Sequence, residues 1–123
     1  MIAILIKTTD EVEIIDIVAG GIDEELRAMQ GFVGGYIEHV RPRGLPRPYC
    51  MIVNEEGLVH ELPRNSAASA LCDGIAPIVG DVLILKDDID ENGDGVIVGI
   101  EPYAAQIIAE KLCLRFPFLT LVQ

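Results

Sequence analysis

The chain has 123 residues, half of them hydrophobic, and its 20 acidic and 9 basic side chains give a net charge of -11. This length fits one domain with a real core, and the apolar content excludes intrinsic disorder. The negative charge repels nucleic acid at long range, so direct nucleic-acid binding is not expected. We predict a single globular domain spanning residues 1–123.

The cysteines and the apolar segments indicate the compartment. Cys50, Cys72 and Cys113 lie far apart, form no C-x-x-C pair and have apolar neighbours. This pattern argues against a disulfide framework and against a cysteine zinc site, and favours three reduced, buried thiols. No signal-peptide pattern and no run of about 20 apolar residues is visible. We therefore expect a cytoplasmic protein that does not enter the membrane.

The first third of the chain predicts a hairpin and then a helix. Apolar segments on either side of Thr8–Glu11 predict paired strands within Met1–Val18. Asp23 is a suitable helix N-cap, and Gly34 is suited to the left-handed residue that ends a helix. Between them, four apolar side chains share one helical face: Leu26, Met29, Phe32 and Val33.

The middle of the chain predicts short strands. Tyr36–Val40 has a strand pattern, and the three prolines of Arg41–Pro48 predict a loop. The segment Tyr49–Leu62, with turn residues at Asn54–Gly57, predicts a second hairpin.

The last half of the chain alternates between helix and strand signals. Asn65 or Ser66 is predicted to cap a short helix, and Pro102 suits the first turn of a final helix. The remaining segments, in chain order, are a helix, a strand, an acidic turn, a second strand and an apolar tail: Ala67–Cys72, Ile78–Leu85, Asp87–Gly95, Val96–Ile100 and Phe116–Val122. Hairpins outnumber βαβ units, which predicts an α+β fold with a mostly antiparallel sheet, a helix near the N-terminus, a short middle helix and a C-terminal helix.

Four segments, in this order and spacing, carry a family resemblance. They are Leu26-x-x-Met29-Gln30-x-x-Val33-Gly34-Gly35-Tyr36-Ile37-Glu38, then Ile52–Leu58, then Leu62-Pro63-Arg64-Asn65 with Ala67-Ala68, and Ile78–Val82. Over roughly residues 1–100 the chain resembles a family of small bacteriophage and plasmid proteins, domain of unknown function 3846. The resemblance implies that the protein is encoded by a mobile genetic element and acts in the cytoplasm of a bacterial host. It supplies no catalytic residues.

An acidic segment matches the calcium loop of EF-hand proteins. Asp90, Asn92, Asp94 and Glu101 occupy ligand positions, and Gly95 occupies the position of the sharp turn. An EF-hand also needs a helix before the loop, whereas the preceding segment is predicted as a strand. We therefore disfavour calcium binding and interpret the segment as an acidic hairpin turn.

Basic residues concentrate around the proline-rich loop. Six side chains form a candidate anion-binding group: Arg41, Arg43, Arg47, Arg64, His39 and His60. The planar arginine fork suits phosphate. The alternative is a solvated loop whose arginines pair with nearby carboxylates.

The sequence shows no catalytic motif. It has no nucleophile elbow, P-loop, dinucleotide fingerprint or H-E-x-x-H motif. We predict a non-enzymatic binding module without a cofactor that antagonises a host defence or regulatory process. It would sequester a nucleotide-like anionic ligand or block a host protein. The alternatives are an acidic decoy that mimics DNA and a calcium-binding protein acting through residues 90–101.

The uncharged tail needs a partner surface. Its apolar side chains must dock on the core or on a second subunit, because exposed apolar surface favours association. We predict a homo-oligomer, most simply a two-fold dimer, with the tail at the interface: Phe116, Phe118, Leu119 and Leu121.

Overall fold

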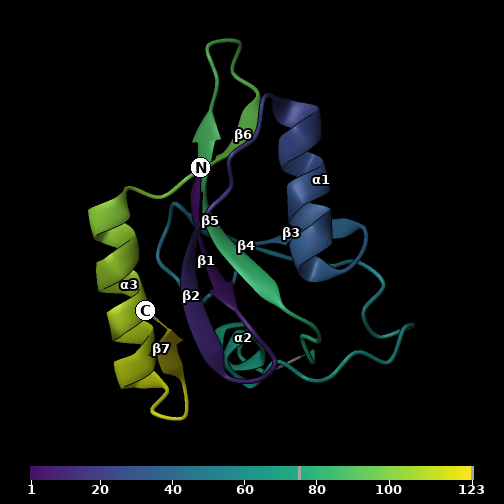
Figure 1. Cartoon of the computed structure of the whole chain (residues 1–123), viewed down its shortest axis with the longest axis vertical. Coiled ribbons are helices and arrows are strands. Elements are labelled where there is room, and N and C mark those ends of the chain that lie inside the picture. The colour runs from purple at the N-terminus through teal and green to yellow at the C-terminus, as the bar shows by residue number, and fades with distance from the viewer. Residues whose placement is uncertain (75, 123) are drawn as a thin grey trace.

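The computed structural model describes residues 1–74 and 76–122 and confirms the predicted α+β fold. Seven strands form a mostly antiparallel sheet, and three helices pack around it in the described part of the chain (Figure 1). The strands are β1 Ile2–Ile6, β2 Glu11–Asp16, β3 Ile37–Val40, β4 Tyr49–Asn54, β5 Val82–Ile89, β6 Gly95–Val98 and β7 Thr120–Val122. The helices are α1 Ile22–Val33, α2 Ser66–Leu71 and α3 Pro102–Arg115.

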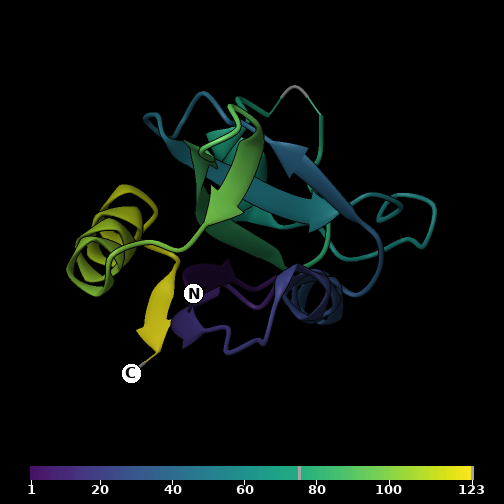
Figure 2. The same ribbon diagram turned by 90° about the horizontal axis from the view of Figure 1, so that it is seen from above.

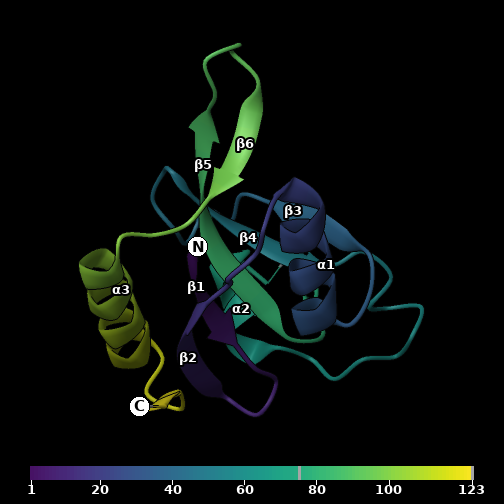
Figure 3. The same cartoon turned by 45° about the horizontal axis from the view of Figure 1, so that its top comes forward.

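The strand order of the sheet is β3-β4-β5-β1-β2-β7. All neighbours are antiparallel except β2 and β7, which run parallel. The long strand β5 pairs with β1 through its first half and with β6 through its second half, up to Ile89. The β5–β6 hairpin therefore extends beyond the rest of the sheet (Figure 3).

Apolar side chains fill both faces of the sheet. One face packs against α2 and α3, and the opposite face packs against α1. Figure 2 shows α1 and α3 on either side of β1 and β2. Because successive strand residues alternate between faces, central strands covered on both sides are apolar at nearly every position. The strand β5 begins in this way, with Val82, Leu83, Ile84 and Leu85 all fully buried.

Several local predictions are confirmed. Strands β1 and β2 form the predicted hairpin. Gly34 ends α1 in the left-handed region at φ 85°, and Pro102 is the first residue of α3. Asn65 caps α2, since its side chain accepts a hydrogen bond from the backbone amide of Ala68.

The start of α1 differs from its prediction. Gly21, and not Asp23, is the N-cap, and Asp23 lies in the first turn. Glu24 reaches back to accept a hydrogen bond from the Gly20 amide at 2.7 Å, which satisfies an otherwise free donor. Of the predicted apolar face, Met29 and Val33 are buried.

The predicted hairpin Tyr49–Leu62 is wrong in its second half. Strand β4 forms, but Leu58–Leu62 contains no strand, because β3 and β5 already occupy both edges of β4. The chain after Gly57 instead makes helical-type turns, such as the hydrogen bond from the His60 amide to the Glu56 carbonyl.

The predicted strand Ile78–Leu85 begins and ends too early. The Gly80 amide donates to the Pro63 carbonyl, and the Ile78 carbonyl accepts from the Asn65 amide, so residues 78–80 pair with that loop. At the other end, β5 continues to Ile89, which places Asp87 in the sheet and shortens the predicted acidic turn.

The apolar tail docks on its own chain. Strand β7 pairs with β2, and Leu119 is 6% exposed. Phe116 and Leu121 pack against the same core cluster, whereas Phe118 is 49% exposed.

Candidate functional site

A cleft of about 810 Å³ is lined by β3, the loop that follows it, and the β5–β6 hairpin. Its polar residues come from distant parts of the sequence: His39 on β3, Arg41 and Arg47 in the following loop, and Asp87 and Asp88 on β5. The β5–β6 hairpin adds an apolar wall of Ile89, Val96 and Ile97. The volume is within the range of small-molecule pockets.

The Arg41–Pro48 loop is anchored at Gly44. The Gly44 amide donates to the carbonyl of Leu71 at 2.8 Å, and its carbonyl accepts from Arg115 Nη1 at 2.8 Å. A Cβ at Gly44 would lie 2.8 Å from the Leu71 Cα, so only glycine permits this approach. The anchor fixes the middle of the loop against α2 and α3.

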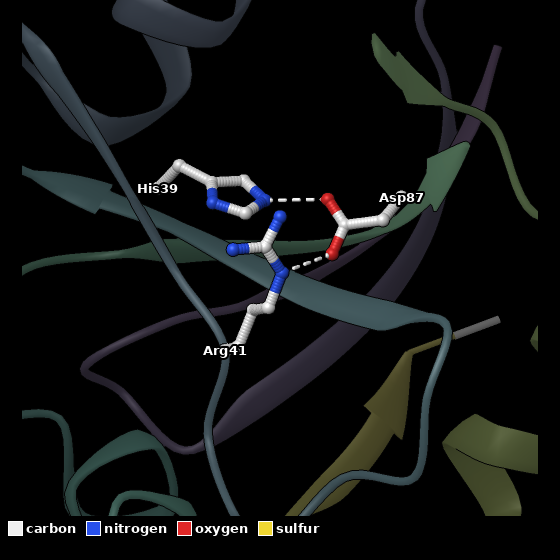
Figure 4. A network of polar contacts seen from close by, with 3 residues as sticks. All are labelled: His39, Arg41 and Asp87. Atoms are coloured by element: carbon white, nitrogen blue, oxygen red, sulfur yellow. Dashed lines mark hydrogen bonds and ion pairs between the residues drawn. The ribbon is translucent and has the colours of Figure 1, made fainter. Parts of the chain in front are cut away.

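Asp87 is the centre of the polar network in the cleft. Its Oδ1 lies 2.7 Å from His39 Nε2, and its Oδ2 accepts a hydrogen bond from Arg41 Nε at 2.7 Å (Figure 4). Burial would raise the pKa of Asp87, but the hydrogen bonds from Arg41 and His39 outweigh it and hold the pKa below its usual 3.8. Asp87 is therefore a carboxylate at neutral pH.

This lowered pKa makes folding stability depend on pH. A carboxylate whose pKa is lower in the folded than in the unfolded chain stabilises the fold above the unfolded pKa, and this contribution is lost as the pH falls through the folded pKa. The gap in unfolding free energy between wild type and Asp87→Asn should be constant above roughly pH 5 and shrink toward pH 2. Urea unfolding at several pH values measures it. Asp88→Asn, at an exposed neighbour, is the control, and a gap that widens at low pH would contradict the assignment.

Cys50 lies beside Asp87 in the sheet. Its side chain is fully buried on β4, and burial followed by the negative charge of Asp87 raises the pKa of the thiol to about 12. The thiol therefore stays protonated at neutral pH unless a cation replaces its proton. His39, Cys50 and Asp87 each offer one ligand atom, and these atoms lie within 4.8 Å of one another.

The arginines of the cleft differ in how they are held. Arg41 is hydrogen-bonded to Asp87 through Nε (Figure 4), and its terminal amino groups make no hydrogen bond to another described residue. The loop's ion pairs within the described chain are Arg41 to Asp87 and Arg43 to Asp73, so Arg47 has no carboxylate partner there. A guanidinium fixed through Nε presents two parallel N–H donors, the geometry that binds an oxyanion bidentately.

The predicted anion-binding group is only partly brought together. His39, Arg41 and Arg47 line the cleft. Arg43 is 87% exposed and lies 4.0 Å from Asp73, and the backbone of Arg64 bridges to Val79. His60 lies 3.5 Å from Glu56 and lines a separate, smaller pocket beside Tyr36.

The acidic segment forms a tight turn between two strands. Asp90 Oδ1 accepts the amides of Asn92 and Asp94, each at 2.9 Å. Glu101 lies beyond β6 and pairs with Lys86 at 3.4 Å. Within the described residues, the histidine, cysteine and carboxylate side chains gather into a possible metal-binding group only at His39, Cys50 and Asp87. The flanking elements of the turn are strands, as we expected when disfavouring an EF-hand.

A family model, described as a domain of unknown function (DUF3846), matches residues 1–107. The chain belongs to the DUF3846 family. No curated protein and no solved structure matches this DUF3846 chain. None of the helices described for this DUF3846 member combines the length and the apolarity needed to cross a membrane.

The sequence predicts the basic residues of the candidate site but not its acidic centre. Its pattern places Asp87 in a turn, 48 residues away from its partner His39. The apolar neighbours of Cys50 predict only a buried hydrophobic side chain. The signal for the acidic centre is the polar pair Asp87-Asp88 near the end of β5, after its apolar residues, since a carboxylate that follows a buried segment lies at the edge of the core.

Proposed function

We propose that this DUF3846 protein is a non-enzymatic binding module that captures a small, nucleotide-like anion in the cleft. The observation that carries the proposal is the pair Arg41 and Arg47. Within the described residues, one guanidinium is oriented by Asp87 and makes no hydrogen bond through its terminal amino groups, and the other has no carboxylate partner.

The charge within the cleft supports this assignment. The chain as a whole carries -11, but Arg41 and Arg47 balance Asp87 and Asp88 in the cleft. The lining of the cleft is therefore neutral within a strongly acidic chain, and it offers directed donors to an anion.

The shape of the cleft favours a ligand with an apolar ring as well as an anionic group. Ile89, Val96 and Ile97 line the side formed by the β5–β6 hairpin. A phosphate could bind the arginines while a base or similar ring lies against this wall. Capture of such a molecule would withdraw it from a host process, and we favour this form of host antagonism over blocking a host protein.

Replacing Arg41 and Arg47 together with alanine should abolish binding of pyrophosphate and ADP, which serve as probes of the ligand class. A charge-assisted hydrogen bond contributes about 1.5–3 kcal/mol, so each single change should weaken binding by roughly tenfold or more. Isothermal titration calorimetry measures the affinities. Arg43→Ala is the matched control, because that arginine lies in the same loop but points to Asp73.

Two outcomes would contradict the proposal. One is that wild type binds neither probe nor any other phosphate-bearing molecule tested at millimolar concentration. The other is that Arg43→Ala weakens binding as much as the double change, because the loop would then act only through its general charge.

A further inference from the structure

Three side chains with metal-binding atoms converge beneath the cleft. His39, Cys50 and Asp87 lie on the neighbouring strands β3, β4 and β5, and their ligand atoms are within 4.8 Å of one another. The strand register explains the convergence. His39 pairs with Ile52, and Cys50 pairs with Leu85. Asp87 follows Leu85 by two residues, and side chains two apart on a strand share a face, so all three lie on the α1 face of the sheet.

We propose that His39, Cys50 and Asp87 bind one divalent transition-metal ion of the zinc class. One imidazole, one thiolate and one carboxylate form a mixed nitrogen, sulfur and oxygen set that suits tetrahedral zinc, and soft thiolate selects against calcium and magnesium. Three protein ligands leave a fourth position open, as in zinc sites that bind an exogenous molecule. Two of the ligands, His39 and Asp87, also line the cleft.

The surroundings of Asp87 already resemble the support of a metal ligand. Arg41 Nε holds Oδ2 at 2.7 Å, so Oδ1 is the oxygen directed at His39 Nε2, also at 2.7 Å. A metal would replace the shared proton once these two atoms move apart to the roughly 3.3 Å between neighbouring tetrahedral ligands, and Arg41 would continue to hold the other carboxylate oxygen. Hydrogen bonds of this kind fix ligand geometry in known metal sites.

The position of Cys50 suits a metal ligand. Its side chain is fully buried on β4, and its sulfur lies within 4.8 Å of the ligand atoms of His39 and Asp87. Metal binding would release the thiol proton to solvent and leave a +2 ion with two negative ligands, which removes the unfavourable charge near the sulfur. The inference depends on these three residues only and stands whether or not the cleft binds an anion.

Cobalt(II) titration of the chelator-treated, reduced protein tests the site. Wild type should show a thiolate-to-cobalt charge-transfer band and the strong visible bands of tetrahedral cobalt, saturating at one ion per chain and lost on adding zinc. Cys50→Ser should lose the charge-transfer band, and His39→Gln should weaken binding by about tenfold or more. Cys113→Ser is the matched control and should keep the wild-type spectrum, because that half-buried thiol lies on α3 outside the cluster.

Folding of each variant is checked by circular dichroism without metal. Should Cys50→Ser fail to fold, His39→Gln and Asp87→Asn carry the test, since both side chains are partly exposed. The proposal is overturned when wild type gives no charge-transfer band, or when the band survives in Cys50→Ser. Pyrophosphate titration of metal-free Cys50→Ser separates the two ideas, because anion binding through the arginines does not require the metal.

Discussion

Replacing Asn65 with alanine should lower the free energy of unfolding by about 3 kcal/mol and Tm by roughly 10 °C. The Asn65 side chain is 1% exposed and makes three hydrogen bonds. Its amide donates to the carbonyls of Ile6 and Gly80 at 3.0 and 3.1 Å, and its oxygen accepts from the Ala68 amide at 3.1 Å. Alanine would remove the cap of α2 and leave two buried carbonyls without these donors.

Two further variants separate the parts of this effect. Asn65→Ser keeps an acceptor for the Ala68 amide, but its side chain cannot reach both carbonyls. Urea unfolding should therefore give a free energy of unfolding between those of wild type and Asn65→Ala. Asn92→Ala, in the exposed β5–β6 turn, should change stability by less than about 0.5 kcal/mol. Equal stability of Asn65→Ala and wild type would contradict the role assigned to this side chain.

Local signals predicted most of the fold because they act within a few residues. Gly34 ends a helix through its own left-handed backbone, and Asn65 caps α2 through a contact with Ala68, three residues away. The hairpin prediction for Tyr49–Leu62 failed because pairing depends on which edges are free. Strand β4 lies inside the sheet between β3 and β5. The turn residues near Gly57 do not indicate that both edges of β4 are already paired.

The candidate site was less predictable because register assembles it. The clustering of Arg41 and Arg47 in one loop predicts their contribution. No local pattern predicts that Cys50 and Asp87 lie together, because their proximity depends on β4 pairing with β5 and on β5 continuing to Ile89. A metal-binding motif has a fixed residue spacing when its ligands lie in one local loop. Ligands that come from three neighbouring strands have no characteristic spacing in the sequence.

The tail offers the second large effect, and it bears on assembly. Leu119 is 6% exposed and packs in the core cluster beneath α3, so Leu119→Ala should lower the free energy of unfolding by about 3 kcal/mol. Deletion after Arg115 should do more. It removes Phe116 from the core and strips β7 from β2, which exposes a strand edge that favours aggregation.

Phe118 is the matched control for this change, and it also tests the predicted dimer. It lies one residue from Leu119 but is 49% exposed, so Phe118→Ser should leave the unfolding free energy of the monomer, measured in urea at a concentration too low for dimers, within about 0.5 kcal/mol of wild type. If the tail forms a two-fold interface, its exposed ring is the part left to reach a partner, and Phe118→Ser should shift light scattering from dimer to monomer. A protein that is dimeric with serine at 118 but monomeric with alanine at 119 would contradict this division, because Leu119 would then belong to the interface and not to the core.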